Sequence, residues 1–146
     1  MAINQITVFL ENRAGKLLEI TKILSENHID LRAINIAETA DYGLLRIIAA
    51  DTEKAESVLK EAGLICTKTP VIAVAVPNKP GGLNSMLEVL AAEKIDLNYM
   101  YSIFGHIDGL AYMILQLSDT DNAKEVLTKN GIGIANAKDL GINYKL

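Results

Sequence analysis

Cysteine and histidine are scarce in this sequence. Its 146 residues contain one cysteine, Cys66, and two histidines. A single cysteine excludes an internal disulfide framework and any site built on a CxxC pair, whether for metal or for redox chemistry. We expect Cys66 to be a small packed residue near a strand, as free cysteines usually are. The disulfide-rich and thiol-based classes of protein are therefore set aside.

Long apolar runs are missing as well. No segment approaches the roughly 20 consecutive apolar residues that a membrane-crossing helix needs. The N-terminal segment MAINQITVFLENR has no basic stretch ahead of a long apolar one, which argues against a secretory signal. We therefore expect a cytoplasmic protein with no membrane partner.

Positive charge and aromatic side chains are sparse. The formal net charge is −4, acidic and basic residues are interspersed, and aromatic residues make up 5% of the chain. Proteins that bind nucleic acids normally present a basic face that displaces counterions from phosphates. Because no cluster of lysine and arginine is visible, we expect no nucleic-acid partner.

The chain does contain an internal repeat. LENRAGKLLEITKILSENHIDL, from Leu10, returns as VPNKPGGLNSMLEVLAAEKIDL, from Val76, at a shift of 66 positions. The shift still aligns Gly43 with Gly109 and becomes 68 in the next segment, so we expect two extra residues near positions 116–118. A period of this length indicates two copies of one small fold. Units of about seventy residues have marginal cores, so we expect the copies to pack together and the chain to dimerise.

Apolar periodicity predicts the elements of each copy. Alternation typical of strands and stripes typical of helices follow each other in the order β-α-β-β-α-β. The predicted segments are 3–10, 15–27, 31–38, 44–50, 51–62 and 64–69 in the first copy, and 71–77, 81–93, 97–104, 110–117, 120–130 and 132–137 in the second. Turn signals at Asp41-Tyr42-Gly43 and Asp108-Gly109 predict hairpins.

The predicted fold class is α+β, with two tandem ferredoxin-like βαββαβ units. Each unit is expected to be an antiparallel sheet with its helices on one face. Residues 1–69 form the first predicted unit and residues 70–146 the second, with Pro70 as the punctuation between them. No Gly/Ser-rich linker intervenes, so we expect the units to pack rigidly.

The turn between the first strand and the first helix of each copy is the best candidate for a site. It contains Asn12, Arg13, Ala14 and Gly15 in the first copy and Asn78, Lys79, Pro80 and Gly81 in the second. The first N–H groups of the following helix lack intrahelical partners and lie at the positive end of its dipole. A glycine there leaves the backbone open to a small carboxylate or phosphate. Helix capping and a tight bend explain the same residues, and for a single copy this is the favoured interpretation; the recurrence of the turn does not separate the two interpretations.

Asp30 and Asp96 are the second candidate feature. Each stands at the start of the second strand of its copy, near the C-terminal end of the first helix. A carboxylate is unfavourable at that end of a helix dipole, which favours a specific role as the acceptor for an ammonium group. The alternative is an aspartate that bonds to its own backbone in a turn.

These features resemble the ACT domain, a ferredoxin-like module that binds amino acids and regulates metabolic enzymes. The resemblance is carried by E-N-R-A-G-K-L in the first copy and P-N-K-P-G-G-L in the second, each followed by a helical stripe and I-D-L. It covers nearly the whole chain and is similar to stand-alone proteins with two ACT domains. In amino-acid-binding members the ligand lies where two ACT units pair. There it contacts the backbone and an Asn of the turn, and often a polar residue at the start of the second strand.

The resemblance implies a set of ligand-binding residues. They are Asn12, Arg13, Ala14, Gly15 and Asp30 in the first copy, and Asn78, Lys79, Pro80, Gly81 and Asp96 in the second. Two features depart from the family pattern, because Asp30 and Asp96 stand where some members have Asn, and Ala14 replaces the common Pro. The change from Asn to Asp removes a donor and adds charge, which leaves the identity of the ligand open.

Enzymes and RNA-binding proteins share this fold and supply alternatives. Acylphosphatase-like proteins place an Arg in the same turn and an Asn on the second strand, which Arg13 and Asn35 match only superficially. The second copy has Lys79 and Tyr101 at those positions. No Ser/His/Asp or Cys/His set recurs, so we expect no catalytic residue, no metal and no cofactor. Tyr99 and Tyr101 are better explained by packing than by base stacking, because the RNA-binding signature is absent from the third strand.

The sequence therefore predicts a non-catalytic sensor that binds a free amino acid at interfaces between ACT units in a homodimer. The ligand carboxylate is expected at backbone N–H groups near Gly15 or Gly81, and its ammonium at Asp30 or Asp96. The alternative is a regulatory subunit that holds a separate enzyme of amino-acid biosynthesis. The chain resembles the small subunits of acetolactate synthase in size and in its first half, but those do not normally repeat the turn so closely in the second half.

Overall fold

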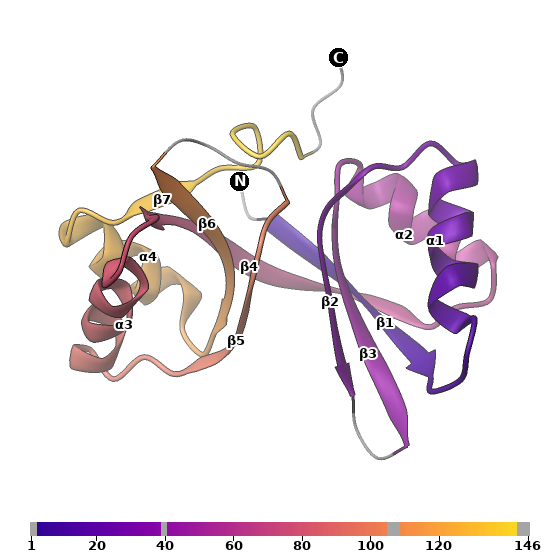
Figure 1. Cartoon of the computed structure of the whole chain (residues 1–146), viewed down its shortest axis with the longest axis horizontal. Coiled ribbons are helices and arrows are strands. Elements are labelled where there is room, and N and C mark those ends of the chain that lie inside the picture. Colours follow the sequence, from indigo (N-terminus) through magenta and orange to yellow (C-terminus); the bar gives the residue numbers. More distant parts are fainter. Residues whose placement is uncertain (1–2, 39–40, 105–108, 143–146) are drawn as a thin grey trace. The chain divides into compact units, whose positions relative to one another are not determined.

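The structure is a computed structural model that describes residues 3–38, 41–104 and 109–142 (Figure 1). In chain order the elements are β1 (Ile3–Glu11), α1 (Lys16–Glu26), β2 (Leu31–Glu38), β3 (Tyr42–Ala49), α2 (Thr52–Glu61), β4 (Cys66–Pro77), α3 (Gly82–Ala92), β5 (Leu97–Ser102), β6 (Leu110–Leu117), α4 (Thr120–Lys129) and β7 (Gly133–Ala135). The order βαββαβ therefore occurs twice, and β4 both closes the first copy and opens the second.

The first copy forms an antiparallel sheet with the strand order β2-β3-β1-β4. Val8 of β1 lies opposite Leu45 of β3, and Ile34 of β2 lies opposite Ile47 of β3. The chain just ahead of β4 joins the other side of β1 through a 3.0 Å hydrogen bond, which the Phe9 N–H donates to the carbonyl oxygen of Ile65.

The second copy repeats this arrangement with the order β5-β6-β4-β7, again antiparallel throughout. Val74 of β4 pairs with Met113 of β6 on one side and with Ile134 of β7 on the other. In each copy both helices cover the same face of the sheet, α1 and α2 in the first copy and α3 and α4 in the second (Figure 1). The predicted α+β fold, with two ferredoxin-like units, is confirmed.

The register shows where the second copy is longer. Leu10 pairs with Gly43, and its counterpart Val76 pairs with Ala111, so the shift is already 68 when β6 begins. The two extra residues therefore lie between β5 and β6, and the prediction that placed them at 116–118 was wrong. The match of Gly43 with Gly109 in the sequence is accidental, because a loop accepts an insertion more easily than a paired strand.

Strand β4 differs from the sequence prediction, which placed two strands on either side of Pro70. The structure has one strand, Cys66–Pro77, that continues through the proline. Proline has no N–H donor, but its φ is compatible with an extended backbone, so it is tolerated where the ladder needs no donor. Pro70 lies before Ile72, the first β4 residue of the β4–β6 ladder.

Each copy has its own apolar core between its sheet and its two helices. The same positions of the repeat supply both cores, as in the pairs Val8 and Val74, Ile20 and Met86, Leu24 and Leu90, Ala55 and Ala123, and Leu59 and Leu127. The helical stripe read from the sequence is thus the buried face of α1 and α3. The N-cap residues of helices α2 and α4 are Asp51 and Asp119. The side chain of each accepts a hydrogen bond from the N–H three residues later.

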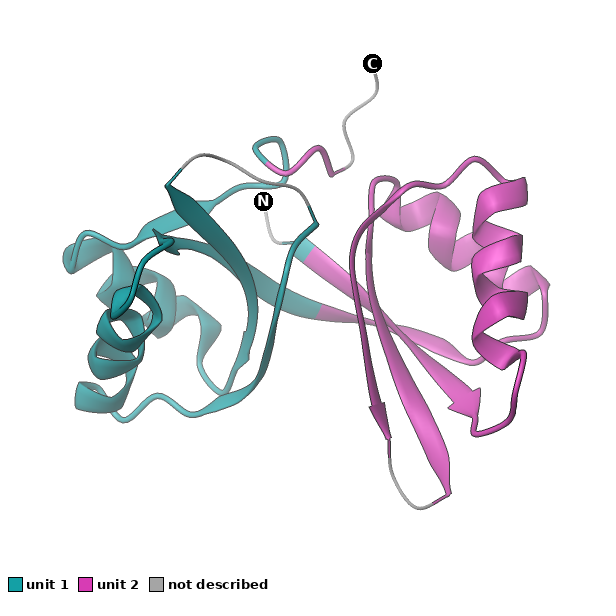
Figure 2. Cartoon of the chain, in the orientation of Figure 1, with its two compact units in different colours: residues 1–3, 70–139 teal, residues 4–69, 140–146 magenta. Residues whose placement is uncertain are grey.

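The chain divides into two compact units (Figure 2). We call residues 4–69 with 140–146 the Gly15 unit, and residues 1–3 with 70–139 the Gly81 unit. Of the described end residues, Ile3 groups with the second copy and 140–142 with the first, whereas the predicted ranges assigned each end to the nearer copy. The turn signal at Asp108 lies outside the described residues. In the part of the chain that is described, no helix is both long and apolar enough to span a membrane.

Candidate functional site

The turns that precede α1 and α3 have the same backbone conformation. Gly15 and Gly81 are the N-cap residues, and both are left-handed, with φ of 83° and 87°. Each glycine carbonyl accepts a 3.0 Å hydrogen bond from the N–H four residues later, which is the first bond of the helix. Glycine adopts this backbone conformation without the steric cost that other residues meet. The backbone conformation of the turn therefore explains why both copies have a glycine at this position.

The turn asparagines do not cap the helices, because the N-cap residue of each is a glycine without a side-chain cap. The Oδ1 of Asn12 instead lies beside Gly43 of β3, 3.2 Å from the place that a Cβ on Gly43 would take. In the second copy the N–H of Asn78 donates a 2.9 Å hydrogen bond to the carbonyl of Gly109. The Asn78 bond thus ties the second turn to the residue before β6, while in the first copy Asn12 lies beside β3.

Both helices begin with backbone N–H groups that have no intrahelical partner. Among the described residues, the N–H groups of Leu17 and Leu18, and those of Leu83 and Asn84, donate to no backbone carbonyl. Apart from the glycine itself and its two chain neighbours, no heavy atom lies within 4 Å of a Cβ built on Gly15 or on Gly81. Each turn thus combines free donors, the positive end of a helix dipole and open space, which suits a small anion.

The remaining turn side chains are exposed. Arg13 Nε donates a 2.9 Å hydrogen bond to Glu11 Oε2, with both side chains largely in solvent. Ala14 and Pro80 occupy the same position in the two copies and offer no side-chain donor, so any contact they make with a ligand is apolar or through the backbone. Lys79 is exposed next to Pro80.

Asp30 and Asp96 occupy equivalent places but have different partners. Asp30 accepts a 2.6 Å hydrogen bond from Arg32 Nη1. In the second copy Asn98 replaces this arginine, and its amide nitrogen donates to Gln116 Oε1 at 2.6 Å. Within the described ranges the Asp96 carboxylate has no salt bridge, while the Asp96 N–H donates to Ser118 Oγ at 3.1 Å. A charged acceptor is thus available in the second copy and already occupied in the first.

Neither unit brings its glycine and its aspartate together. Gly15 precedes α1 and Asp30 follows it, and α1 is 11 residues long. At 1.5 Å per residue the two ends of such a helix are about 16 Å apart. The same holds for Gly81 and Asp96 at the two ends of α3, which is also 11 residues long. One small ligand cannot reach both residues within a single unit.

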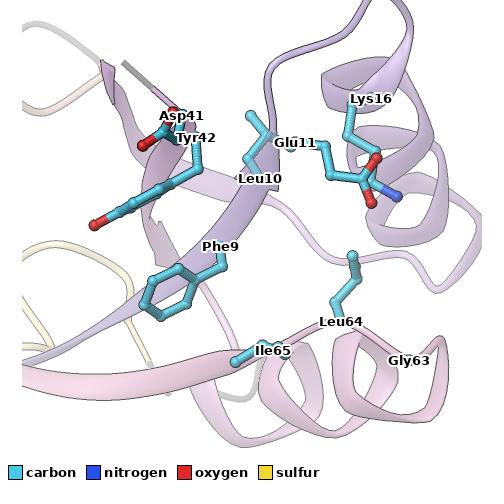
Figure 3. A pocket seen from close by; sticks show the side chains of 9 residues that line it. All are labelled: Phe9, Leu10, Glu11, Lys16, Asp41, Tyr42, Gly63, Leu64 and Ile65. Carbon is cyan, nitrogen blue, oxygen red and sulfur yellow. The ribbon is translucent and has the colours of Figure 1, made fainter. Parts of the chain in front are cut away.

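A pocket that the sequence did not predict lies beside the first turn, within the Gly15 unit. Its volume is about 240 Å³. It is lined by Phe9, Leu10, Glu11, Lys16, Asp41, Tyr42, Gly63, Leu64 and Ile65. Figure 3 shows the rings of Phe9 and Tyr42 on one side of it and the side chains of Glu11 and Lys16 on the other. Four separate segments contribute to the lining, so no single sequence motif predicts the pocket.

Neither the glycine turns nor the pocket contains a metal site or a residue with a shifted pKa among the described residues. Among the described residues, no group of three or more His, Cys, Asp or Glu side chains is placed to hold a metal ion. Burial raises the pKa of the Cys66 thiol, against an opposing effect of Lys60 and with a smaller contribution from Glu56. Its hydrogen bond to Glu53 raises the pKa of the exposed Lys68 amine. Both groups belong to β4, and neither belongs to a glycine turn.

Two ferredoxin-like units in one chain, each opening a helix N-terminus with a left-handed glycine, define the class of this protein. The family model that describes an ACT domain pair matches residues 1–143, and the chain belongs to this family. The resemblance noted in the sequence is confirmed.

Among solved structures, protein BT0572 from Bacteroides thetaiotaomicron is 38% identical, with a TM-score of 0.89 over 97% of this chain and 96% of that one. The regulatory subunit of aspartate kinase from Thermus thermophilus is 12% identical, with a TM-score of 0.63 over 86% of this chain and 90% of that one. The corresponding subunit from Thermus flavus is 13% identical, with a TM-score of 0.62 over 86% and 88%. At the last two identities the likeness concerns the fold alone. The comparison with curated proteins finds no relative.

Proposed function

We propose that this chain is a non-catalytic regulatory protein that binds a free amino acid, with the ligand carboxylate at the Gly81 turn. The observation that carries the proposal is the helix N-terminus built in both copies, with a left-handed glycine and open space where a Cβ on that glycine would lie. Free N–H groups and a helix dipole suit a small carboxylate. Membership of the ACT domain pair family supports the regulatory role.

The second copy is the better candidate because its aspartate is available. An ammonium group that approaches Asp30 must compete with the guanidinium of Arg32, which is 2.6 Å from the carboxylate. Asp96 has no such competitor among the described residues. An exposed ion pair such as Asp30–Arg32 is worth up to about 1 kcal/mol, so a free acceptor makes up to roughly a fivefold difference in affinity.

A shared ligand requires a second chain. The carboxylate and the ammonium of an amino acid are attached to one carbon, whereas Gly81 and Asp96 lie at opposite ends of α3. The Gly81 turn of one chain must therefore meet Asp96 of another for both to hold one ligand. A homodimer follows from this requirement.

A thermal-shift screen of the twenty amino acids tests the ligand class. The small number of ligand atoms limits the affinity, so we expect dissociation constants from micromolar to millimolar. A ligand at a hundred times its dissociation constant stabilises the folded state by about 2.7 kcal/mol, which a melting scan detects. If no amino acid shifts the melting temperature or releases heat in calorimetry at concentrations on the order of 10 mM, the proposal fails.

Two matched substitutions test the turn. Gly81→Asp and Gly81→Asn have the same shape, and both residues tolerate the left-handed region. The aspartate also suits the positive end of the helix dipole, so it should not unfold α3. We expect Gly81→Asp to abolish binding by repelling the ligand carboxylate and Gly81→Asn to weaken it less. Equal affinities for the two variants would exclude a carboxylate at this turn.

A second pair of substitutions tests the ammonium acceptor. Asp96→Asn removes the charge at similar size and is expected to weaken binding about tenfold or more. Asp30→Asn is the matched control, because the carboxylate it removes is already paired with Arg32. Equal loss of affinity in both variants would contradict the assignment to Asp96.

The second candidate function is a regulatory subunit that holds a separate biosynthetic enzyme. The observation in its favour is the fold shared with the aspartate kinase regulatory subunits. A stable complex with such an enzyme in the absence of any amino acid, together with a negative ligand screen, would favour it over the sensor.

A further inference from the structure

We infer that the pocket of the Gly15 unit is a second ligand site, built from side chains, for an amino acid with an aromatic or branched apolar side chain. Its volume of about 240 Å³ lies just below the ~300–1,000 Å³ usual for drug-sized ligands, which suits a molecule of amino-acid size. The inference takes its ligand class from the proposed function and differs from it in location and in selectivity.

One side of the pocket is an uncovered apolar wall. The rings of Phe9 and Tyr42 lie with their centroids 5.7 Å apart and their planes tilted by 41°. Ile65 stands beside Phe9, held there by the hydrogen bond from the Phe9 N–H to the Ile65 carbonyl, and is 68% exposed. The free energy of binding becomes more favourable when a ligand removes large apolar side chains from water. This wall therefore selects a ligand with an apolar body.

The other side of the pocket carries charges of both signs. The Lys16 side chain is only 14% exposed, which is unusual for lysine, and its ammonium lies 3.5 Å from the Glu19 carboxylate. Lys16 is also the first residue of α1, where a cation opposes the helix dipole. A ligand carboxylate beside Lys16 would add to the Glu19 carboxylate in offsetting both costs. Glu11 lies on this side too, but its carboxylate is already paired with Arg13. Asp41, which Figure 3 shows beside Tyr42, lines the same pocket and offers an acceptor to an ammonium group.

These charges favour a zwitterion over a simple anion. The lining carboxylate of Asp41 would repel a ligand that carried negative charge alone, whereas it attracts the ammonium of an amino acid. The cation that holds the carboxylate and the acceptor of the ammonium belong to one pocket, so a single unit satisfies both ends of the ligand.

The second copy shows that the fold itself does not require this pocket. In place of Phe9, Glu11, Lys16, Asp41, Tyr42 and Ile65 it has Ala75, Pro77, Gly82, Gly109, Leu110 and Gly133. Both the aromatic wall and the charged side are lost. At Gly82 a side chain would force the backbone to shift, because a Cβ would lie 2.0 Å from the carbonyl oxygen of Pro77. The pocket residues thus serve the first copy alone, which favours a ligand over a structural need.

Titration calorimetry of the full chain with L-phenylalanine and L-leucine tests the inference, with glycine as the ligand that lacks an apolar body. Phe9→Ala places in the pocket the residue that the second copy already has at the matched position. Phe104→Ala is its control, an exposed phenylalanine of the other unit. Lys16→Met removes the buried ammonium, and Lys22→Met is its control on the same helix, 70% exposed and paired with Glu26.

We expect binding of phenylalanine or leucine that is at least about tenfold tighter than that of glycine. Phe9→Ala and Lys16→Met should each weaken it about tenfold or more, while the two controls leave it unchanged. Phenethylamine, which lacks the carboxylate, should bind more weakly than phenylalanine to the wild-type protein, and Lys16→Met should reduce that difference.

The outcomes separate this inference from the proposed function. If an amino acid binds and only Gly81→Asp abolishes the binding, the pocket inference is overturned and the proposed function stands. Equal effects of Lys16→Met and Lys22→Met would likewise overturn the pocket. If neither phenylalanine nor leucine binds but a polar amino acid does, the selectivity inferred here is wrong. If no amino acid binds at all, both proposals fail.

Discussion

Gly82 has no room for a side chain, whereas the equivalent residue of the first copy carries a long one. Its counterpart Lys16 carries a long side chain, but a Cβ on Gly82 would lie 2.0 Å from the Pro77 carbonyl oxygen. Backbone atoms cannot move aside as a flexible side chain can, so the clash must distort the turn. We expect Gly82→Ala to lower the free energy of unfolding by about 2–3 kcal/mol, as overpacking does.

Gly133→Ala is the matched control for this prediction. A Cβ on Gly133 would lie 3.7 Å from the Ala75 Cβ, which is an ordinary contact. Alanine also restricts the unfolded chain more than glycine does, so this variant should be neutral or more stable by up to about 1 kcal/mol. Urea unfolding of both variants measures the difference, and a Gly82→Ala variant as stable as Gly133→Ala would show that the turn is looser than the structure has it.

Gly15 and Gly81 illustrate what residue patterns can and cannot tell. Their recurrence in the repeat predicted a common turn, which the structure has. A valine at either position would place its branched side chain where a ligand is expected, but it would also disturb the turn. The φ of 83° and 87° makes valine strained there, because β-branched residues avoid the left-handed region. The comparison of aspartate with asparagine at Gly81 avoids this confounding loss of stability.

At the scale of elements, β4 is the segment that both copies share, and Cys66 stands at its start. Because burial raises the pKa of this thiol, the folded protein resists its deprotonation. Near pH 9.0, the ordinary value for a thiol, the unfolded chain loses its proton first. The contribution to stability is therefore complete below that pH and is lost as the pH rises through the higher folded-state pKa.

We expect the wild-type chain to lose more stability than Cys66→Ala between pH 8 and about pH 10, as measured by urea unfolding at each pH. The raised pKa of Lys68 acts above its ordinary value of 10.5 and is common to both proteins. Thiol labelling of native protein at neutral pH should be much slower than labelling of the unfolded chain. Equal pH dependence in the two proteins would mean that Cys66 is more open to solvent than the structure shows.

The helices and strands could be predicted because the same apolar pattern occurs in both copies. The stripe through Ile20 and Leu24 recurs at Met86 and Leu90, and the periodicity therefore located α1 and α3 closely. The continuity of β4 could not be predicted, because Pro70 is typical of a break and only the neighbouring strands show that its missing donor is tolerated. The two extra residues of the second copy were misplaced for a similar reason. Only the strand register shows that the counterpart of Gly43 in the second copy is Ala111 and not Gly109.

At the scale of the molecule, the candidate sites differ in how far the sequence reveals them. The glycine turn is local in sequence, so its residues and the open start of the helix that follows it could be predicted. The pocket of the Gly15 unit combines Phe9, Lys16, Tyr42 and Ile65 from four segments, and its signal lies in the positions where the copies disagree. The sequence comparison emphasised agreement between the copies and therefore missed the pocket.

The two sites also differ in how they depend on assembly. A ligand held by the Gly81 turn and by Asp96 of a second chain binds only to the dimer, so its apparent affinity must fall when the protein is diluted below the dimer dissociation constant. By linkage, the same ligand must strengthen dimerisation by an equal factor. A ligand in the pocket of the Gly15 unit contacts one chain, so its affinity should not depend on protein concentration.

Sedimentation velocity with and without the ligand, from about 0.1 to 100 µM protein, distinguishes these cases. For binding at the Gly81 turn we expect a dimer fraction that rises with ligand in the wild type and in Gly81→Asn, but not in Gly81→Asp. For binding in the pocket we expect no ligand effect on the dimer fraction, and a heat of binding that Phe9→Ala removes. A protein that stays monomeric at about 100 µM, with its ligand saturating, contradicts the shared site because Gly81 and Asp96 would then have no second chain to bring them together.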